Sequence, residues 1–131
     1  MSYSNPDRRS YGWGVHDFGS GGEVYSIKGP KGKAGRLVAI HVAATETFTT
    51  TTTAARVDVG TAADTDAYAS FNLGALADTD SAATDDGVTD TDAIISADIP
   101  ADTQVEVTLV APTGGTPAGM GVPTIWIDWA D

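Results

Sequence analysis

The sequence predicts an all-β protein, an antiparallel β-sandwich or jelly roll of about seven or eight strands with an extended N-terminal arm. Short runs that alternate large apolar and polar residues recur along the chain, and turn residues separate them. No stretch places large apolar residues at the i, i+3, i+4 and i+7 spacing of an amphipathic helix. The length of 131 residues suits a single hydrophobic core.

Residues 1–22 are the predicted arm, and residues 23–131 are the predicted domain. The arm interleaves aromatic side chains with five glycines, a density that opposes regular structure. Each aromatic side chain left in water forgoes about 1.5–3 kcal/mol of burial. We therefore expect the arm either to fold back over its own core or to dock on a neighbouring subunit. Its aromatic residues are Tyr3, Tyr11, Trp13 and Phe18, and the last three are candidate partner contacts.

The first predicted strands flank a turn at residues 28–33. Residues 24–27 are a short β-prone run that Gly29 and Pro30 end. Residues 36–47 form the longest candidate, with apolar side chains on both faces, which is typical of a central strand. Alternation places Val38, Ile40 and Val42 on one face of that strand and Leu37, Ala39 and His41 on the other.

Further strands are expected on both sides of an acidic loop at residues 74–90. Before it, five threonines at residues 49–53 fit a strand or an extended loop, and Val57 and Val59 alternate with Asp58. The remaining predicted strands are residues 67–73, 93–99, 103–110 and 124–129. In the last of these, Ile125, Ile127 and Trp129 share one face, and Trp126 and Asp128 share the other.

The supply of large apolar side chains is small. Leu, Ile, Val and Phe number 4, 7, 11 and 3, and the formal net charge is −11. This composition lies near the boundary with disordered chains. Either the chain is partly disordered, or its subunits complete their burial in an oligomer. The grouping of the apolar residues in periodic runs favours the oligomer.

Charge is unevenly distributed along the sequence. All seven basic residues lie in residues 1–56, and residues 57–131 carry only acidic charges. The acidic part disfavours nucleic acid and anionic membranes as partners. Its acidity fits simple solubility, or a dipolar subunit whose basic end meets an acidic partner. The basic turn supplies candidate partner contacts in Lys28, Lys31, Lys33 and Arg36, although a solvated hairpin turn has the same composition.

Signs of catalysis or of a cofactor are few. The two histidines, His16 and His41, have no partner at a spacing that suggests a proton relay, and there is no cysteine. We therefore expect no enzyme. Asp-Thr-Asp occurs three times, at residues 64–66, 78–80 and 90–92. Two carboxylates on one side of a strand can share Ca²⁺, but these residues also favour simple turns, so the predicted cofactor set is empty with calcium as the alternative.

Several stretches resemble the head-stabilising proteins of tailed bacteriophages. They include KGPKGKAGRLV (residues 28–38), GTAADTDAY (residues 60–68) and IPADTQVEV (residues 99–107). The resemblance spans residues 24–66 and 91–129. It implies a capsid decoration, or cement, protein: a small β-sandwich, often a homotrimer, that binds the major capsid protein on the exterior of the virion. It supplies no catalytic residues.

Two alternatives keep the fold and change the role. In the first alternative, the chain is another virion component, such as a head-fibre base or a tail protein. As a jelly-roll carbohydrate-binding module instead, it would present Trp126 and Trp129 to sugar rings. Tryptophans on strand faces also serve as core or interface residues, so both assignments stay open for them.

Overall fold

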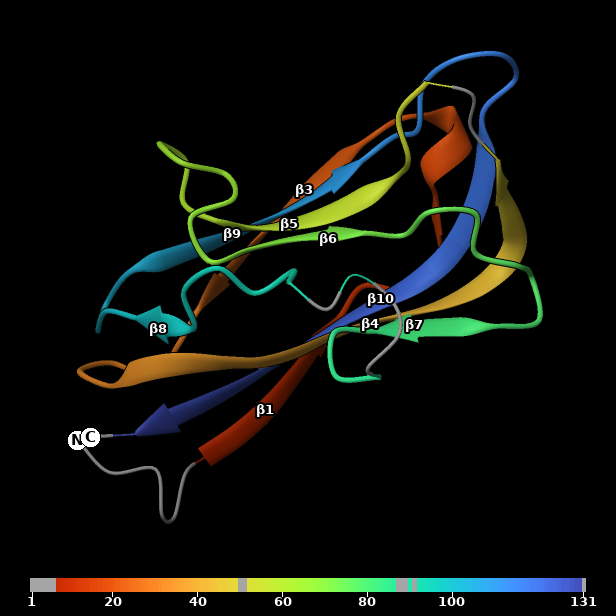
Figure 1. Ribbon diagram of the computed structural model, residues 1–131. Coiled ribbons are helices and arrows are strands. Elements are labelled where there is room, and N and C mark those ends of the chain that lie inside the picture. The colour runs from red at the N-terminus through yellow and green to blue at the C-terminus, as the bar shows by residue number, and fades with distance from the viewer. Residues whose placement is uncertain (1–6, 50–51, 87–89, 91, 131) are drawn as a thin grey trace.

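The protein is a sandwich of two antiparallel sheets, one of them strongly curled, in the computed structural model (Figure 1). The structure describes residues 7–49, 52–86, 90 and 92–130. Sheet A has the order β1-β10-β4-β7, with β2 also paired to β10 and β8 to β4, and sheet B has the order β3-β9-β5-β6. The strands are β1 (Asp7–Gly12), β2 (His16–Asp17), β3 (Glu23–Lys28), β4 (Ala34–Thr49), β5 (Arg56–Gly60), β6 (Ala69–Asn72), β7 (Ser81–Ala83), β8 (Asp98–Ile99), β9 (Gln104–Val110) and β10 (Ala118–Ala130).

The order of the strands is that of a jelly roll. Because β1 and β2 both pair with β10, they occupy one position at an edge of sheet A. For the same reason β7 and β8, which both pair with β4, occupy the opposite edge. Each sheet then has four positions, and the chain passes between the sheets as two Greek keys. The predicted fold class is confirmed.

Alternating side chains build the core between the sheets. In β9 the buried residues are Val105, Val107 and Leu109, and the intervening side chains face outward. The same period in β10 buries Ile125 and Ile127. The largest fully buried side chains of the core are Trp129, Phe18, Phe48, Phe71, Ile40, Ile99, Leu109, Ile125, Ile127, Val42, Val57 and Val59.

A single chain closes this core without a partner. Its accessible surface is 6395 Å². Folded monomers of 13.4 kDa expose about 6,500 Å² by the usual scaling with mass. This area is that of an ordinary monomer, and the expectation that the subunit joins an oligomer stays a prediction.

Residues 7–22 belong to the sandwich instead of forming an irregular arm. β1 pairs with β10 over its whole length, from Asp7 opposite Trp129 to Gly12 opposite Thr124. Phe18 begins a short 3-10 helix, η1 (Phe18–Ser20), and is 0% exposed. The predicted absence of regular structure is wrong here, because β10 offers an unpaired edge that outweighs the cost of the glycines. The fold-back alternative holds for this part, whereas Tyr3 lies outside the described residues.

The longest predicted strand is central, as expected, but its two faces differ from simple alternation. Ile127 lies opposite Leu37 and Trp126 opposite Ala39, which leaves Val38 as an extra residue in a β-bulge. The bulge turns Leu37, instead of Val38, into the core with Ile40 and Val42.

The segment after the acidic loop crosses between the sheets instead of forming the predicted strand at residues 93–99. Ser70 N donates to Ala93 O at 2.9 Å on the β6 side, and Leu37 N donates to Ala97 O at 2.8 Å on the β4 side. Only Asp98–Ile99 is a strand, β8. The predicted acidic loop itself contains β7, which pairs with β4.

Elsewhere the predicted strands appear with changed ends, and β10 begins at Ala118, six residues before its predicted start. Thr50 and Thr51 lie outside the described residues. Within the described part of the chain, no helix has the length and apolar character required to cross a membrane.

Candidate functional site

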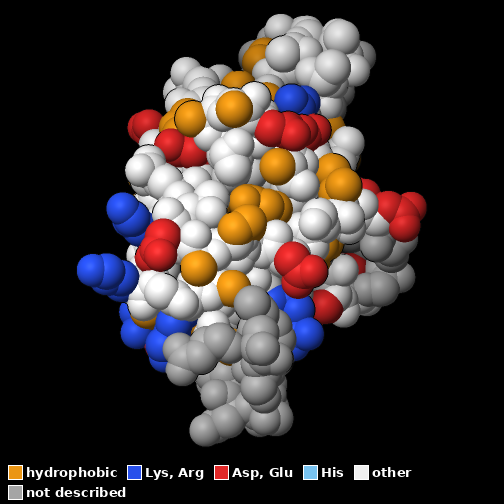
Figure 2. Space-filling model, turned by 90° about the vertical axis from the view of Figure 1, so that its left-hand side faces the viewer, with side chains coloured by type: hydrophobic (Ala, Val, Ile, Leu, Met, Phe, Trp, Pro, Cys, Tyr) orange, Lys and Arg blue, Asp and Glu red, His pale blue; other side chains and the backbone are white. Residues whose placement is uncertain are grey.

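Three turns meet at one end of the sandwich. They connect β3 to β4 (residues 29–33), β5 to β6 (residues 61–68) and β8 to β9 (residues 100–103). The register places them together, because Lys28 pairs with Gln104 and Gly60 pairs with Glu106 on neighbouring strands of sheet B. We call this surface the turn end; it lies on the left in Figure 1 and faces the viewer in Figure 2.

The β3–β4 turn has a defined shape because two glycines lie against a tryptophan ring. A Cβ atom on Gly29 would approach the Trp129 indole to 2.4 Å, and one on Gly35 would approach it to 2.6 Å. Between them Gly32 adopts a φ of +76°, a conformation that favours glycine. Gly32 N also donates a 2.9 Å hydrogen bond to Asp102 Oδ1, which joins this turn to the β8–β9 turn.

The predicted lysines lie together on this turn. Lys28 and Lys31 are exposed, and Lys33 is partly buried. Within the described residues, neither Lys28 nor Lys31 has a carboxylate within ion-pair distance. These two ammonium groups are therefore available to a partner.

Arg36 lies nearby but within a row of alternating charges on the outer face of sheet A. It is opposite Asp128 of β10 on one side and Asp98 of β8 on the other. Arg8 of β1 completes the row: its Nε and Nη2 donate to Asp128 Oδ1 and Oδ2 at 2.7 and 2.9 Å. The hydrogen bonds from Arg8, aided by the positive charges of Arg8 and Arg36, lower the pKa of the nearly buried Asp128 despite its burial.

Apolar side chains are exposed at the turn end. Ile95 is 63% exposed, and its backbone N–H donates to Tyr68 O at 2.8 Å, which fixes it beside the β5–β6 turn. Other exposed apolar residues on these turns are Ala62, Ala63, Pro100 and Ala101. Figure 2 shows apolar side chains across this end, with charged side chains of both signs between and around them. Apolar side chains mixed with polar ones also make up many protein–protein contacts.

The uneven charge of the sequence does not become a separation in space. Asp98 and Asp102 lie on the same end as the lysines, and so do Asp64 and Asp66 of the β5–β6 turn. The dipolar-subunit alternative is therefore wrong for the described residues, since the fold brings the acidic half of the chain beside the basic half.

The predicted aromatic contacts lie on β1, on η1 and between them. Phe18 is a core residue, with its ring centroid 5.2 Å from that of Phe48, so it has no surface to offer a partner. This corrects its assignment as a contact. Tyr11 and Trp13 are partly buried against the core, and Trp13 stacks on Tyr25 at a centroid distance of 4.5 Å. The structure therefore brings the basic residues together on one turn. Tyr11 lies close to that turn, because it accepts a hydrogen bond from the Trp129 ring that packs against Gly29.

Residues that suggested chemistry have structural partners. His16 Nε2 lies 2.9 Å from Gly21 O, and His41 Nε2 lies 3.5 Å from Asp85 Oδ1. A hydrogen bond with the Asp66 carboxyl raises the pKa of Asp64. Residues 7–49, 52–86, 90 and 92–130 contain no group of three side chains able to hold a metal ion, and Thr91 lies outside them. Calcium stays a prediction without a site.

Sequence reasoning missed Ile95 and Asp102 as parts of this surface. Ile95 fell within a predicted strand, where alternation assigns an apolar side chain to a core. Asp102 has a positive φ of 56° in a tight turn, and only the fold shows that its carboxylate reaches Gly32.

Comparison with known proteins yields one distant similarity. No protein-family model matches the chain, and no curated protein matches it significantly. Among solved structures, a chain of the capsid asymmetric unit of cyanophage Pam1 aligns with 90% of this chain and 86% of its own length. The TM-score is 0.38 and the sequence identity is 12%, values at which the likeness does not establish a common fold.

Proposed function

We propose that this chain is a structural protein of a tailed-phage virion. It acts as a decoration protein that binds the outer surface of the assembled capsid and stabilises it. The subunits associate as a homotrimer, and the turn end contacts the major capsid protein. In this proposal the chain is not an enzyme, and it has no substrate and no cofactor.

One observation carries the proposal. The three stretches that resemble head-stabilising proteins are far apart in sequence, yet each contains one of the three turns of the turn end. The first stretch includes residues 29–33, the second residues 61–68 and the third residues 100–103. The resemblance also covers buried strands of both sheets, because it spans residues 24–66 and 91–129. Its three stretches nevertheless share one exposed surface, the turn end.

The composition of that surface suits repeated weak binding. Lys28 and Lys31 offer charges to an acidic partner, and Ile95 offers an apolar side chain that a partner can bury. Such a contact is modest for one subunit. Because a capsid repeats the same site many times and an oligomer engages several at once, avidity multiplies modest affinities.

Co-sedimentation with purified phage heads tests the proposal. Heads of the encoding phage that lack this protein are incubated with it and pelleted, and the bound amount is measured against concentration. We expect saturable binding at a fixed number of copies per head, and a loss of at least tenfold in affinity for Ile95→Asp. Val24→Asp, which changes a 54% exposed apolar residue at the opposite end of β3, is the matched control and should bind normally.

Two results would overturn the assignment. Absence of saturable binding to heads removes the capsid role. Binding to purified tails or fibres in place of heads assigns the chain to another part of the virion, such as a head-fibre base or tail component.

A further inference from the structure

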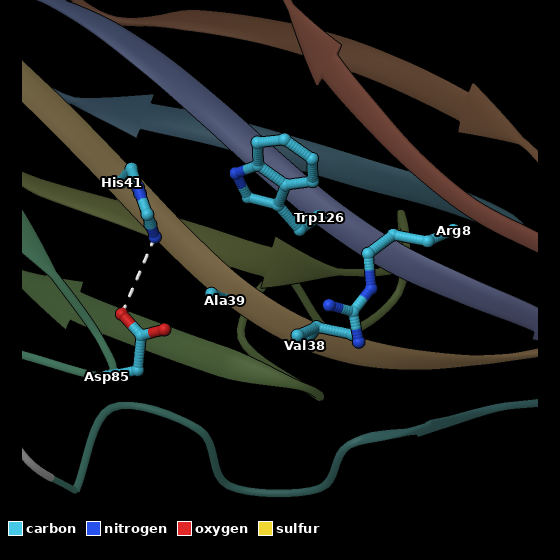
Figure 3. Close-up of a pocket in the computed structure, with 6 residues that line it drawn as sticks. All are labelled: Arg8, Val38, Ala39, His41, Asp85 and Trp126. Atoms are coloured by element: carbon cyan, nitrogen blue, oxygen red, sulfur yellow. Dashed lines mark ion pairs between the residues drawn. The ribbon is translucent and has the colours of Figure 1, made fainter. Parts of the chain in front are cut away.

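A hollow of about 220 Å³ lies on the outer face of sheet A, away from the turn end. Figure 3 shows the Trp126 ring between His41 on one side and Arg8 on the other. Its lining residues come from three strands and the segment after β7: Arg8, Val38, Ala39, His41, Asp85 and Trp126. Pockets for drug-sized ligands measure about 300–1,000 Å³, so this hollow suits a smaller group, of the size of one ring.

The sequence builds the hollow by placing small residues beside a large one. On the outer face, Trp126 lies between Ser10 of β1 and Ala39 of β4, its cross-strand neighbours. Neither neighbour is large enough to cover an indole ring. The bulge at Val38 falls next to this row, so an additional apolar side chain lines the floor. Bulges commonly redirect side chains next to binding sites.

Polar groups border the indole on both sides. The His41 side chain is 46% exposed and that of Asp85 65%, and their 3.5 Å contact leaves both free to rearrange. On the other side, Arg8 is fixed by its two hydrogen bonds to the nearly buried Asp128 carboxylate. The hollow therefore has a fixed hydrogen-bond donor in Arg8, a movable carboxylate in Asp85 and an apolar surface in the Trp126 ring.

One polar atom in the site has no partner. Trp126 Nε1 is buried and makes no hydrogen bond within the described residues. Figure 3 shows this nitrogen on the edge of the ring that faces His41. A buried N–H group without an acceptor costs free energy, so this edge favours an added acceptor. The exposed His41 ring can turn aside to admit one, because its contact with Asp85 is long.

We propose that the hollow binds one ring of a saccharide. The indole provides the flat surface on which the C–H face of a sugar packs, and its N–H donates to a ring hydroxyl. Asp85, on the same side as the N–H, accepts from hydroxyls there, and Arg8 donates to hydroxyls on the other side. Charges of both signs surround the hollow, which favours a neutral, hydroxyl-rich ligand over an anion or a cation.

Trp129, the other tryptophan expected at a saccharide site, does not take part. It is 2% exposed, and its ring packs in the core against Gly29 and Gly35. Saccharide binding at Trp126 is independent of the turn end, so a virion protein that docks through its turns would still expose this face to glycans.

Indole N–H signals in ¹H–¹⁵N NMR spectra test the site directly. The three tryptophans give three such signals, and Trp126→Phe identifies one by its loss. The probes are the methyl glycosides of glucose, galactose, mannose and N-acetylglucosamine, with glycerol as a hydroxyl-rich control without a ring. We expect at least one glycoside to shift the Trp126 signal saturably, while the Trp13 and Trp129 signals stay in place.

A pair of variants separates the hollow from the surrounding sheet. Asp85→Asn should weaken binding by at least fivefold, whereas Asp98→Asn, on the same face but outside the hollow, should not change it. Binding that survives Trp126→Phe and Asp85→Asn unchanged would refute the site. So would the absence of a saturable shift with every glycoside. A Trp126 shift that follows only protein concentration would assign this face to self-association instead.

Discussion

Tyr11 and Trp129, 118 residues apart, are joined by a hydrogen bond of 2.9 Å from the indole Nε1 to the Tyr11 hydroxyl. The bond satisfies the polar edge of a core tryptophan with a residue of the first strand. Tyr11→Phe leaves that buried N–H without an acceptor, and we expect a loss of about 1–3 kcal/mol in unfolding free energy. Urea denaturation measures it. Tyr25→Phe removes a tyrosine hydroxyl with no hydrogen bond in the described structure and should cost far less.

The Trp129 ring also limits what can replace glycine in β4. Gly35→Ala places a methyl group at 2.6 Å from the ring, so the indole must shift in a packed core. We expect a destabilisation of about 1–3 kcal/mol, the range for overpacked cores. Gly12→Ala, whose Cβ would meet its nearest atom at 3.6 Å, is the matched strand control. Equal melting temperatures for the two variants would contradict this packing.

Asp128 makes the free energy of unfolding depend on pH in the acidic range. Its pKa is lowered from 3.8 in the folded state, chiefly by hydrogen bonds from Arg8, so the unfolded chain takes up a proton first as the pH falls. The stabilisation is complete above about pH 5 and is lost as the pH decreases through 3.8 and the lowered folded pKa. Asp128→Asn should therefore differ most from the wild type at neutral pH and converge with it in acid. Urea titrations at several pH values measure the difference.

Binding to capsids should depend on the exposed lysines. Changing Lys28, Lys31 and Lys33 together to Glu reverses the charge of the β3–β4 turn, and we expect it to abolish co-sedimentation with heads. Replacing the same three residues with Arg keeps the charge and should preserve binding. Wild-type binding should also weaken with added salt, since exposed charges are screened over about 8 Å at 0.15 M. Undiminished binding of the Glu variant would remove the lysines from the interface.

A closed core predicts that the monomer survives dilution. Because one chain buries its own interior, separating the subunits of the proposed trimer should leave the fold intact. Light scattering after size exclusion gives the mass, and circular dichroism gives the strand content at each concentration. We expect the mass to fall on dilution while the spectrum stays constant. Loss of strand signal together with loss of mass would restore the incomplete-core account.

Alternation in the sequence predicts the central strands because one physical rule governs them. In β9, and in β10 as far as Ile127, the buried residues are those that a period of two selects. At the end of β10 the rule fails, because Arg8 covers Asp128 on the outer face. The rule fails at Val38, where the inserted bulge residue exchanges the two faces of β4. Nothing in a run of apolar residues on both faces marks where such an insertion falls.

The sequence also did not predict which charged side chains are buried. Asp58 reads as the solvent side of a half-buried strand, yet it is 3% exposed. Arg56 Nε donates to its carboxylate at 3.1 Å and Ser70 Oγ donates at 2.7 Å, and these neighbours cover it. The contact between Asp58 and Ser70 depends on the register of two paired strands, and local composition does not specify that register.

The residues of the turn end could likewise be predicted only in part from the sequence. The basic residues of the β3–β4 turn are adjacent in sequence and were predicted together. Ile95 and Asp102 join them only because β9 pairs with both β3 and β5, which brings separate turns to one end. Long-range strand pairing, and not local propensity, decides which residues meet there.

The position of β10 between β1 and β4 also sets an order of events during biosynthesis. Of all the strands in sheet A it is the last to leave the ribosome, and both of its neighbours must wait for it. Until then β1 has nothing to pair with in sheet A, and β4 has one unpaired edge. An unpaired edge of this kind favours edge-to-edge aggregation, and pairing with β10 removes it.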